Sequence, residues 1–392
     1  MSDLAELVEV PVGVLDSWRT ATLAVVIQTL TAGVSVNANN RTITAGEFGV
    51  LKTSCVSGGQ FLADEHKAVL TGEVKRVRTP VSAGSIIISR MNTPALVGAN
   101  AYVDEDHPAL FLPDRLWALK TNERADCRWL SYFMQSAAFR LFIDDIATGT
   151  SGSMKNISKE RLLQLQLVIP PLDEQRRIAE VLRSVDDAIL AADETLRVTR
   201  HVFARVRAEL LESARQRFDE IAVANAIAKN KGQKITKLQT SEYLEEGVIS
   251  IIDQGATFVC GYTDDAAVIW PYGLPVIVFG DHTRILKFVD FPFAIGADGT
   301  QCITPAPALN ARYLYYALQS LDLLGEGYAR HFKLLKEKTI PLPGLPEQVA
   351  IAGQLLALED SIAAAEQIAE RHLATKRALM SNLLSGRVRV PT

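Results

Sequence analysis

The stretch IPPLDEQRRIAEVLRSVDDAI, residues 169–189, decides the fold because it returns later in the chain as LPGLPEQVAIAGQLLALEDSI, residues 342–362. The two copies share nine identical residues, and each of them recurs 173 positions later without a gap. A chain that repeats itself at nearly half its length is most simply a duplicated unit. Such a chain suits a partner that also comes in two halves.

Both copies continue as long amphipathic helices. Their apolar residues alternate at steps of four and three, which is the heptad seam of a coiled coil. The seam contacts are predicted at Ile178, Leu182, Val185, Ile189 and Leu196 in the first copy and at Ile351, Leu355, Leu358 and Ile362 in the second. His372 and Lys376 interrupt the second seam. Because no proline follows the first turn, each helix is predicted to run for ~38 residues, near 174–213 and 347–384.

Three arrangements would bury these two seams. The helices can form a coiled coil between chains, they can be ordinary core helices, or they can pair antiparallel with each other inside one chain. The segment between them, about 130 residues, is long enough for a whole domain. This length favours the third arrangement.

A globular segment precedes each helix. The string RWLSYFMQS at 128–136 aligns with RYLYYALQS at 312–320, and short β-branched runs such as 247–252 lie between turn residues. The apolar runs at 84–90 and 273–279 are each predicted to be a strand that is followed by a polar loop. We therefore predict an α+β protein with two mixed α/β domains related by an internal pseudo-two-fold repeat and separated by two long antiparallel coiled-coil helices. The predicted domains are residues 1–172 and 215–345, and the predicted helical regions are 173–214 and 346–392, the last including the C-terminal tail.

Composition narrows the class of protein. With 392 residues, 48% of them hydrophobic and 22% charged, the chain can bury ample core. It has no apolar run of 18 residues, and its start, MSDLAELVEV, lacks a secretory leader, so we expect a soluble cytoplasmic protein without membrane contact. Its four cysteines stand far apart without a nearby histidine, so no metal site is predicted. The net charge of −4 neither indicates nor excludes nucleic-acid binding.

The repeated motif resembles that of the specificity subunits of type I restriction-modification systems. The family's pattern P-P-L-x-E-Q-x-x-I-A-x-x-L-x-x-x-D is complete from Pro170 to Asp186, and the second copy departs from it at Gly344 and Glu359. The strings GDHTR at 280–284 and FVDFPFAIGADG at 288–299 also resemble a common class of target-recognition domain. The resemblance covers nearly the whole chain.

The resemblance implies two target-recognition domains held apart by two antiparallel helices, each domain reading one half of a bipartite site in double-stranded DNA. It also implies that the chain itself performs no chemistry. Two adenine-methyltransferase subunits would dock on it, and ATP-dependent restriction subunits would join through them. The chain is thus expected to hold no cofactor, with S-adenosylmethionine, ATP and magnesium bound by the partner subunits.

Residues suited to DNA contact are present in both globular segments. Phosphate contacts need clustered positive charge, and base reading needs side chains that form paired hydrogen bonds in a groove. The candidate DNA-binding residues are Lys75, Arg76, Arg78, Arg90, Asn92, Lys155 and Asn156 in the first segment, and Lys229, Lys231, Lys234, Lys237, His282, Thr283, Arg284, Arg330 and Lys333 in the second. Each charge run taken singly also fits an ordinary solvated surface.

Signatures of catalysis are missing from the sequence. It contains no phosphate-binding G-x-x-x-x-G-K-[ST] loop and no G-x-G-x-x-G, and no nucleophile elbow marks a catalytic triad. No catalytic residue is therefore predicted. The alternative to a DNA-reading subunit is a coiled-coil adaptor that binds other proteins and has no affinity for DNA. An enzyme on a duplicated scaffold ranks third, because it needs a convergent acid, base or metal cluster.

Overall fold

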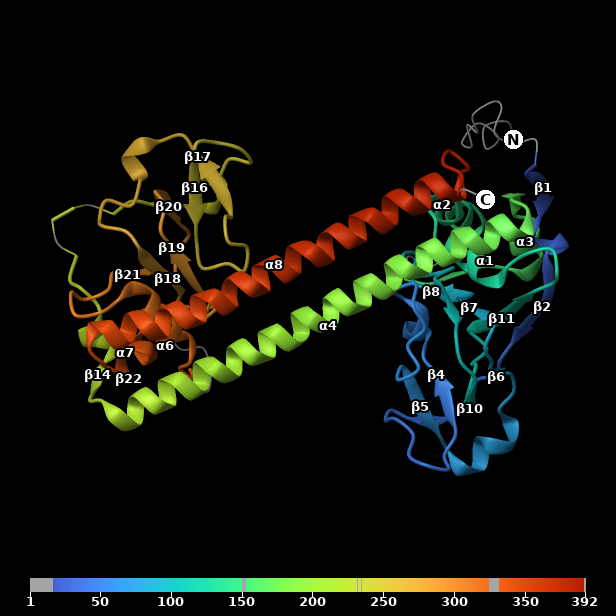
Figure 1. Cartoon of the computed structure of the whole chain (residues 1–392), viewed down its shortest axis with the longest axis horizontal. Coiled ribbons are helices and arrows are strands. Elements are labelled where there is room, and N and C mark those ends of the chain that lie inside the picture. The colour runs from blue at the N-terminus through green and yellow to red at the C-terminus, as the bar shows by residue number, and fades with distance from the viewer. Residues whose placement is uncertain (1–16, 150–152, 231, 234, 324–330, 391–392) are drawn as a thin grey trace. The chain divides into compact units, whose positions relative to one another are not determined.

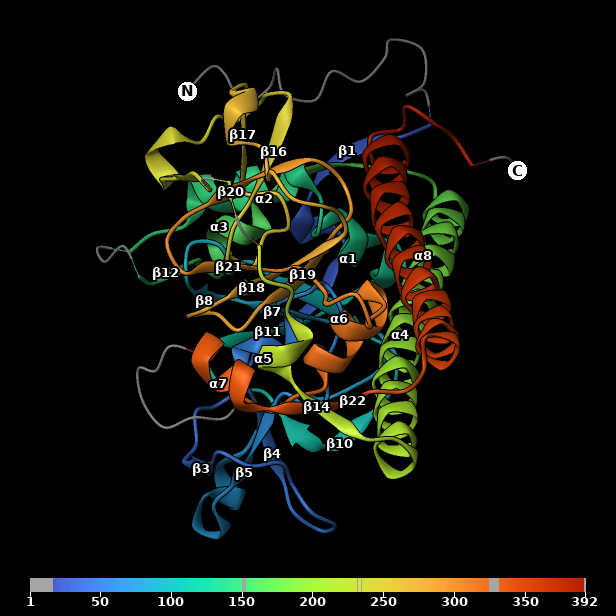
Figure 2. The same ribbon diagram turned by 90° about the vertical axis from the view of Figure 1, so that its left-hand side faces the viewer.

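The computed structural model describes residues 17–149, 153–230, 232–233, 235–323 and 331–390. The chain divides into two compact units. Figures 1 and 2 show the chain coloured by residue number, from blue at the N-terminus to red at the C-terminus. Unit 1 comprises Met1–Ala191 and Ala369–Thr392, and unit 2 comprises Ala192–Ile368. Among the described residues, no helix has the length and apolar character needed to cross a membrane.

Unit 1 contains a four-stranded and a five-stranded sheet. The four-stranded sheet has the order β2-β11-β7-β9, and the five-stranded sheet has the order β3-β5-β4-β10-β6. Its strands are β1 Arg19–Thr22, β2 Ile27–Ala32, β3 Ala38–Asn39, β4 Gly49–Leu51, β5 His66–Val69, β6 Pro80–Val81, β7 Ser85–Ser89, β8 Met91–Asn92, β9 Asn100–Val103, β10 His107–Phe111, β11 Leu116–Thr121, β12 Lys155–Asn156 and β13 Gln166–Ile169. Its short helices are η1 Leu23–Val25, η2 Thr53–Val56, η3 Thr71–Arg76, α1 Cys127–Phe133, α2 Ala137–Ile146 and α3 Lys159–Leu163.

Unit 2 contains a four-stranded sheet of order β15-β20-β16-β17 and a three-stranded sheet of order β19-β18-β21. Its strands are β14 Glu220–Ala222, β15 Lys237–Leu238, β16 Ile249–Ile252, β17 Gly261–Thr263, β18 Val276–Gly280, β19 Leu286–Val289, β20 Phe293–Gly296, β21 Thr300–Ile303 and β22 Thr339–Pro341. Its short helices are α5 Val223–Ala226, η4 Thr240–Glu242, η5 Ala266–Val268, α6 Ala311–Gln319 and α7 His331–Glu337.

Equivalent strands form the centre of each unit. The strand β7 reads SIIIS and β18 reads VIVFG, and every residue of both is buried. A continuous apolar run of this length is typical of a strand that is covered on both faces. In each unit this strand pairs antiparallel with two neighbours, β11 and β9 in unit 1 and β21 and β19 in unit 2. Both runs were predicted to be strands, and this prediction is confirmed.

The repeated motif forms two long helices, α4 Leu172–Arg217 and α8 Leu345–Leu384. In unit 1 the beginning of α4, with Ile178 and Leu182, shares a core with Leu383 at the end of α8 (Figures 1 and 2). In unit 2 the end of α4, with Leu211, shares a core with Leu355 near the beginning of α8. In each unit the start of one helix meets the end of the other, so the predicted antiparallel pairing within one chain is confirmed.

The observed helices are slightly longer than predicted. Both begin two residues earlier, and α4 continues to Arg217. All nine predicted seam residues are buried or half-buried, and their roles as seam contacts stay a prediction. The division of the chain into domains at 172, 214 and 345 stays a prediction.

A buried glutamine fixes α1 on the start of α4. The side-chain oxygen of Gln175 accepts a 2.7 Å hydrogen bond from the backbone N–H of Asp126, the residue that caps α1. Its amide nitrogen donates to the carbonyl oxygens of Pro170 at 2.8 Å and Arg124 at 3.3 Å. Three backbone groups that burial would leave unpaired are therefore satisfied by one side chain.

Gln348 does the same for α6 at the start of α8. Its side-chain oxygen accepts from the backbone N–H of Asn310, the cap of α6, at 2.7 Å. Its amide nitrogen donates to the carbonyl oxygens of Pro343 at 2.8 Å and Ala308 at 3.0 Å. The glutamine of the repeated E-Q pair is thus the joint between a globular fold and a long helix, and it is built alike in both units.

The two ends of the described chain complete unit 1. Glu174, which is 3% exposed, accepts a hydrogen bond from the indole N–H of Trp18 at 3.0 Å and forms an ion pair with Arg389. In unit 2 the matching residue, Glu347, forms its ion pair with Arg217 at 3.1 Å. The partner of Glu347, Arg217, is the last residue of α4. The partners of Glu174, by contrast, come from segments near the two ends of the described chain.

Candidate DNA interface

The two units differ most in the loops that their sheets carry. In unit 1, β8 and β12 form a small antiparallel ribbon in which Asn92 lies opposite Lys155, and Asn156 lies opposite Met91. Asn92 donates from its amide to the hydroxyl of Ser89 at 3.2 Å. The ribbon brings together three residues that were predicted separately from the sequence.

Two of the predicted residues of unit 1 lie beside Trp117 and the ribbon. The guanidinium of Arg90 lies 5.8 Å from the centre of the Trp117 ring and donates from Nε to the carbonyl of Asp114 at 2.6 Å. The side-chain oxygen of Asn156 is buried and has no hydrogen-bond partner among the described residues. A buried acceptor without a partner is costly, so this oxygen is a candidate for a bond formed on binding.

The basic cluster of residues 75–78 lies in and after η3, and its three long side chains are exposed. Arg76 forms an ion pair with Glu73, and Arg78 donates from its guanidinium to the carbonyls of Lys75 and Val77. Two of the three charges therefore have partners in or next to the cluster. An exposed ion pair is worth little in water, so it exchanges readily for a phosphate contact.

The predicted lysines of unit 2 occupy different environments. Lys229 and Lys333 are exposed, the latter on α7. Lys237 is half-buried and donates from its ammonium to the carbonyl of Thr300 at 2.7 Å. Lys231, Lys234 and Arg330 lie outside the described residues.

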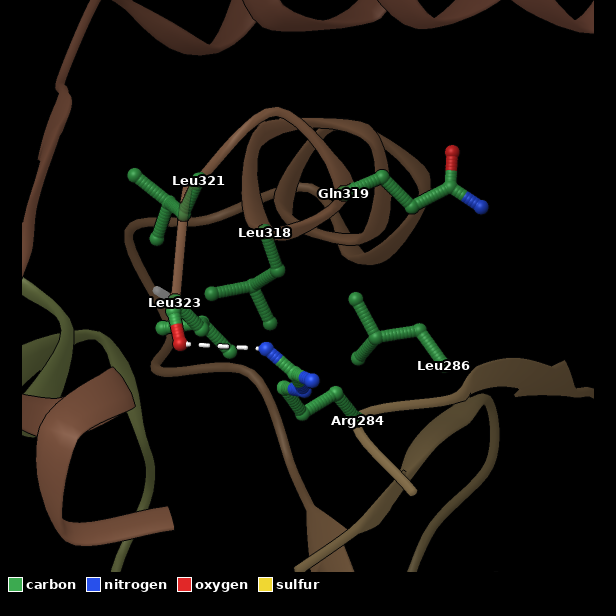
Figure 3. A pocket seen from close by; sticks show the side chains of 6 residues that line it. All are labelled: Arg284, Leu286, Leu318, Gln319, Leu321 and Leu323. Carbon is green, nitrogen blue, oxygen red and sulfur yellow. Dashed lines mark hydrogen bonds between the residues drawn. The ribbon is translucent and has the colours of Figure 1, made fainter. Parts of the chain in front are cut away.

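Arg284 lines a pocket in unit 2. The pocket has a volume of about 340 Å³ and is lined by Arg284, Gln319 and four leucines, Leu286, Leu318, Leu321 and Leu323 (Figure 3). Figure 3 shows the guanidinium directed across the pocket, where it donates to the carbonyl of Leu323 at 3.4 Å. The backbone of Arg284 is left-handed, with φ of 62°. The base contact predicted for this residue stays a prediction.

His282 and Thr283 lie in the turn between β18 and β19, and both are exposed. The hydroxyl of Thr283 donates to the carbonyl of Gln254 at 2.5 Å, and the backbone N–H of His282 donates to the side-chain oxygen of Gln254 at 3.3 Å. The turn is thereby tied to the loop that follows β16.

Sequence reasoning missed the two residues that organise this edge of unit 2, Gln254 and Lys287. Lys287 lies in β19, is 4% exposed, and donates from its ammonium to carbonyls of the loop after β16. Burial lowers the pKa of Lys287, and the carboxylate of Asp253 opposes that shift. A lysine inside the alternating string LKFV reads as a solvent-facing strand residue, so no local signal separated it from the surface.

Metal ligation finds no support in the part of the chain that the structure describes. No three histidine, cysteine or acidic side chains among these residues come close enough to hold an ion. Burial raises the pKa of the thiol of Cys55 to about 12 and that of Cys127 to about 11. These two thiols therefore stay protonated near neutral pH.

Comparison with known proteins agrees with the architecture. Residues 29–198 match the family model described as "Type I restriction modification DNA specificity domain". Over 349 residues the chain is 24% identical to the putative type I restriction enzyme MjaX specificity subunit of Methanocaldococcus jannaschii, a match that covers 79% of each protein. The chain is therefore similar to type I restriction-modification specificity subunits over most of its length. Over 151 residues it is also 28% identical to the EcoR124I/EcoR124II specificity subunit of Escherichia coli, covering 36% of this chain and 37% of that protein.

Solved structures share the fold of this chain. The S subunit of the type I system from M. genitalium matches with a TM-score of 0.62 at 16% identity, over 93% of this chain and 96% of that one. A chain from a study of the assembly and conformational transition of the type I R-M system matches with a TM-score of 0.50 at 14% identity, over 94% of this chain and 98% of that one. At such identities the likeness concerns the fold alone.

Proposed function

We propose that the chain is the DNA-reading subunit of a type I restriction-modification complex and that each unit reads one half of a bipartite site in double-stranded DNA. One observation supports the proposal most strongly. The contact that joins a globular fold to a long helix is repeated in both units, while the loops proposed to read DNA differ between them. Gln175 and Gln348 fix equivalent helices in equivalent ways. The loops on the two units, by contrast, are built from different residues. A duplicated scaffold with unlike loops suits two unlike half-sites.

The chemistry of these loops supports DNA as the partner. Exposed lysine and arginine side chains on both units supply the charge that displaces counterions from phosphates. Asparagine, histidine and arginine side chains in turns and short strands have the donors and acceptors that base edges require. In this proposal the clusters at 75–78 and 229–237 position the duplex, and the segments at 90–92 and 282–284 read bases.

The reaction itself belongs to partner subunits in this proposal. Two adenine methyltransferases bind the chain and carry S-adenosylmethionine, and restriction subunits that use ATP and magnesium join through them. The chain holds no cofactor and acts by choosing the site. The similarity to known proteins supports this division of labour, because the relatives are named as specificity subunits of restriction enzymes.

Selection from a library of random duplexes tests the function against the adaptor alternative. The full chain, assembled with its methyltransferase subunits, is expected to enrich two short conserved blocks separated by a spacer of fixed length. Binding to the enriched duplex should weaken steeply as salt rises, because each phosphate contact adds about one unit to the slope of log affinity against log salt. An adaptor enriches no sequence and shows no salt-dependent affinity for any duplex.

A further inference from the structure

Three loops meet at one edge of unit 2. Residues 253–258 follow β16, residues 281–285 join β18 to β19, and residues 297–299 join β20 to β21. We propose that Lys287 and Gln254 are positioning residues that hold these three loops in one arrangement and thereby set the base preference of one half-site. The proposal rests on the DNA-reading function proposed above and adds the residues that set the specificity of one unit.

Lys287 holds the first loop, residues 253–258, through its buried ammonium group. Its ammonium is 2.6 Å from the carbonyl oxygen of Thr257 and 2.8 Å from that of Asp253, with a third carbonyl, that of Phe258, at 3.4 Å. A carboxylate oxygen of Asp253 lies 3.8 Å from the ammonium nitrogen and balances its positive charge. An ammonium has three donors and no acceptor, so three inward-pointing carbonyls match it. The loop is thus folded around a buried cation.

Gln254 ties the first loop to the other two. Its amide nitrogen donates to the carbonyl of Asp298 at 2.7 Å, which reaches the loop at 297–299. Its side-chain and backbone oxygens accept from the backbone N–H of His282 and the hydroxyl of Thr283. One residue therefore contacts both neighbouring loops, and a shift of the first loop moves the other two.

Two glycines make room for this joint. A Cβ added at Gly299 would lie 2.8 Å from the amide atoms of Gln254, and one added at Gly280 would lie 2.0 Å from the hydroxyl of Thr283. Gly299 also has a left-handed backbone, with φ of 84°. The three loops can therefore approach one another this closely because residues 280 and 299 have no side chain.

The joined loops present side chains suited to DNA. Phe258 is 43% exposed, and His282, Thr283 and Asp298 on the other two loops are also exposed. Imidazole, hydroxyl and carboxylate groups offer the donors and acceptors that distinguish base pairs, and an aromatic ring packs on bases or thymine methyl groups. Their relative positions are set by Lys287 and Gln254, which lie behind them.

No lysine or arginine is buried in the part of unit 1 that the structure describes, so it holds no counterpart of this cation. The strand equivalent to β19 is β9, since Arg128 lies over Tyr102 of β9 as Arg312 lies over Phe288 of β19. The residue before Tyr102 is Ala101, which is fully buried in an apolar cluster. A change at Lys287 therefore has no equivalent in unit 1, and the other half-site serves as an internal control.

Competitive binding with substituted duplexes tests the proposal. The full chain with its methyltransferase subunits is given the enriched duplex and variants with one base pair changed in either block. In Lys287→Met, and separately in Gln254→Ala, discrimination at one block is expected to fall about tenfold, the scale of one lost base contact. The same block should be affected by both variants, and discrimination at the other block should stay at the wild-type level. Tyr313→Phe removes a buried hydrogen bond to the carbonyl of Pro341 in the same unit and should leave both blocks unchanged.

The outcomes separate the two proposals. If Lys287→Met does not fold, Gln254→Ala decides, because Gln254 is only half-buried and lies in a loop. Wild-type discrimination at both blocks in a folded variant, or an equal loss at both blocks, overturns the positioning role while the DNA-reading function stands. A wild-type complex that discriminates at neither block overturns the proposed function itself.

Discussion

Individual buried side chains join each globular fold to its long helix, and the two glutamines of the repeat are the clearest example. Removing the side chain of Gln175 leaves a buried N–H and two carbonyls without partners. We expect Gln175→Ala and Gln348→Ala each to lower the free energy of unfolding by about 1–3 kcal/mol, the cost of unsatisfied buried groups. Denaturant unfolding measures this change.

A matched control for the glutamines lies on the exposed surface of α4. Gln216 donates to Glu212 one turn away at 3.1 Å, and both residues are exposed. Gln216→Ala should change the unfolding free energy by less than about 0.5 kcal/mol. Equal effects of Gln175→Ala and Gln216→Ala would show that the buried bonds do not carry the joint.

Tyrosines of α6 give unit 2 a predicted dependence on alkaline pH. Burial raises the pKa of Tyr315 to about 12, and the charge of Glu359 adds to the shift. Because the pKa in the folded state lies above the ordinary value of 10.0, this contribution to stability is complete below pH 10. It is then lost as pH rises toward 12, since the unfolded chain releases the phenolic proton first.

The pH prediction is checked by denaturant unfolding between about pH 10 and pH 12. Within this window one such tyrosine contributes a loss approaching ~1.4 kcal/mol per pH unit. Tyr315→Phe should therefore show a shallower fall of stability with pH than the wild type. Parallel curves for the two proteins would contradict the assignment.

At the scale of elements, an ion pair crosses the helix pair inside unit 1. Lys376, which interrupts the predicted apolar seam of α8, lies with its ammonium 2.7 Å from a carboxylate oxygen of Asp186 on α4. The other oxygen of Asp186 accepts from the hydroxyl of Tyr132 at 2.7 Å. The side chains of Lys376 and Asp186 are only 15% and 16% exposed. The charged residue that interrupts the apolar seam is therefore neutralised by a partner on α4.

Removing one member of this pair should cost more than a surface ion pair is worth. We expect Lys376→Met to destabilise the protein by about 2 kcal/mol, between the ~1 kcal/mol of an exposed pair and the ~3–5 kcal/mol of a broken buried pair. Adding Asp186→Asn should recover part of the loss, because no uncompensated charge then remains. Arg197→Met, which breaks an exposed pair with Glu194, is the control. A similar small cost for Lys376→Met and Arg197→Met would contradict a role for the buried pair.

For the molecule as a whole, the sequence predicted the scaffold better than the reading surfaces. Heptad spacing and a gap-free repeat depend on local pattern, and they led to the prediction of two antiparallel helices. The strands β7 and β18 were recognised because continuous apolar runs leave few alternatives. These features are encoded within single segments of the chain.

Reading surfaces depend on contacts between segments far apart in sequence. Lys287 binds carbonyls some thirty residues away, and Gln254 reaches Asp298 across 44 positions. No spacing rule reveals such contacts, and a buried lysine looks like a surface lysine in the sequence. The contacts of Gln175 and Gln348 were predictable only in part. The sequence marks both residues because they recur in the repeat, but it does not reveal the backbone groups that they bind.

The central claim is that two units of one chain read two half-sites in an order fixed by the chain. In the described chain, α4 and α8 are the helices that pass from one unit into the other, at Ala191–Ala192 and Ile368–Ala369. Inserting four residues at each of these points lengthens both helices by ~6 Å. If the helices lie along the duplex, whose base pairs rise ~3.4 Å, the spacer should grow by one or two base pairs.

Sequencing of methylated adenines in cells that carry either the wild-type chain or this insertion variant, each with its methyltransferase subunits, makes the test. We predict one bipartite motif for the wild type and the same two blocks with a longer spacer for the variant. An active variant that keeps the original spacer, or methylation at a single continuous motif, would contradict the claim.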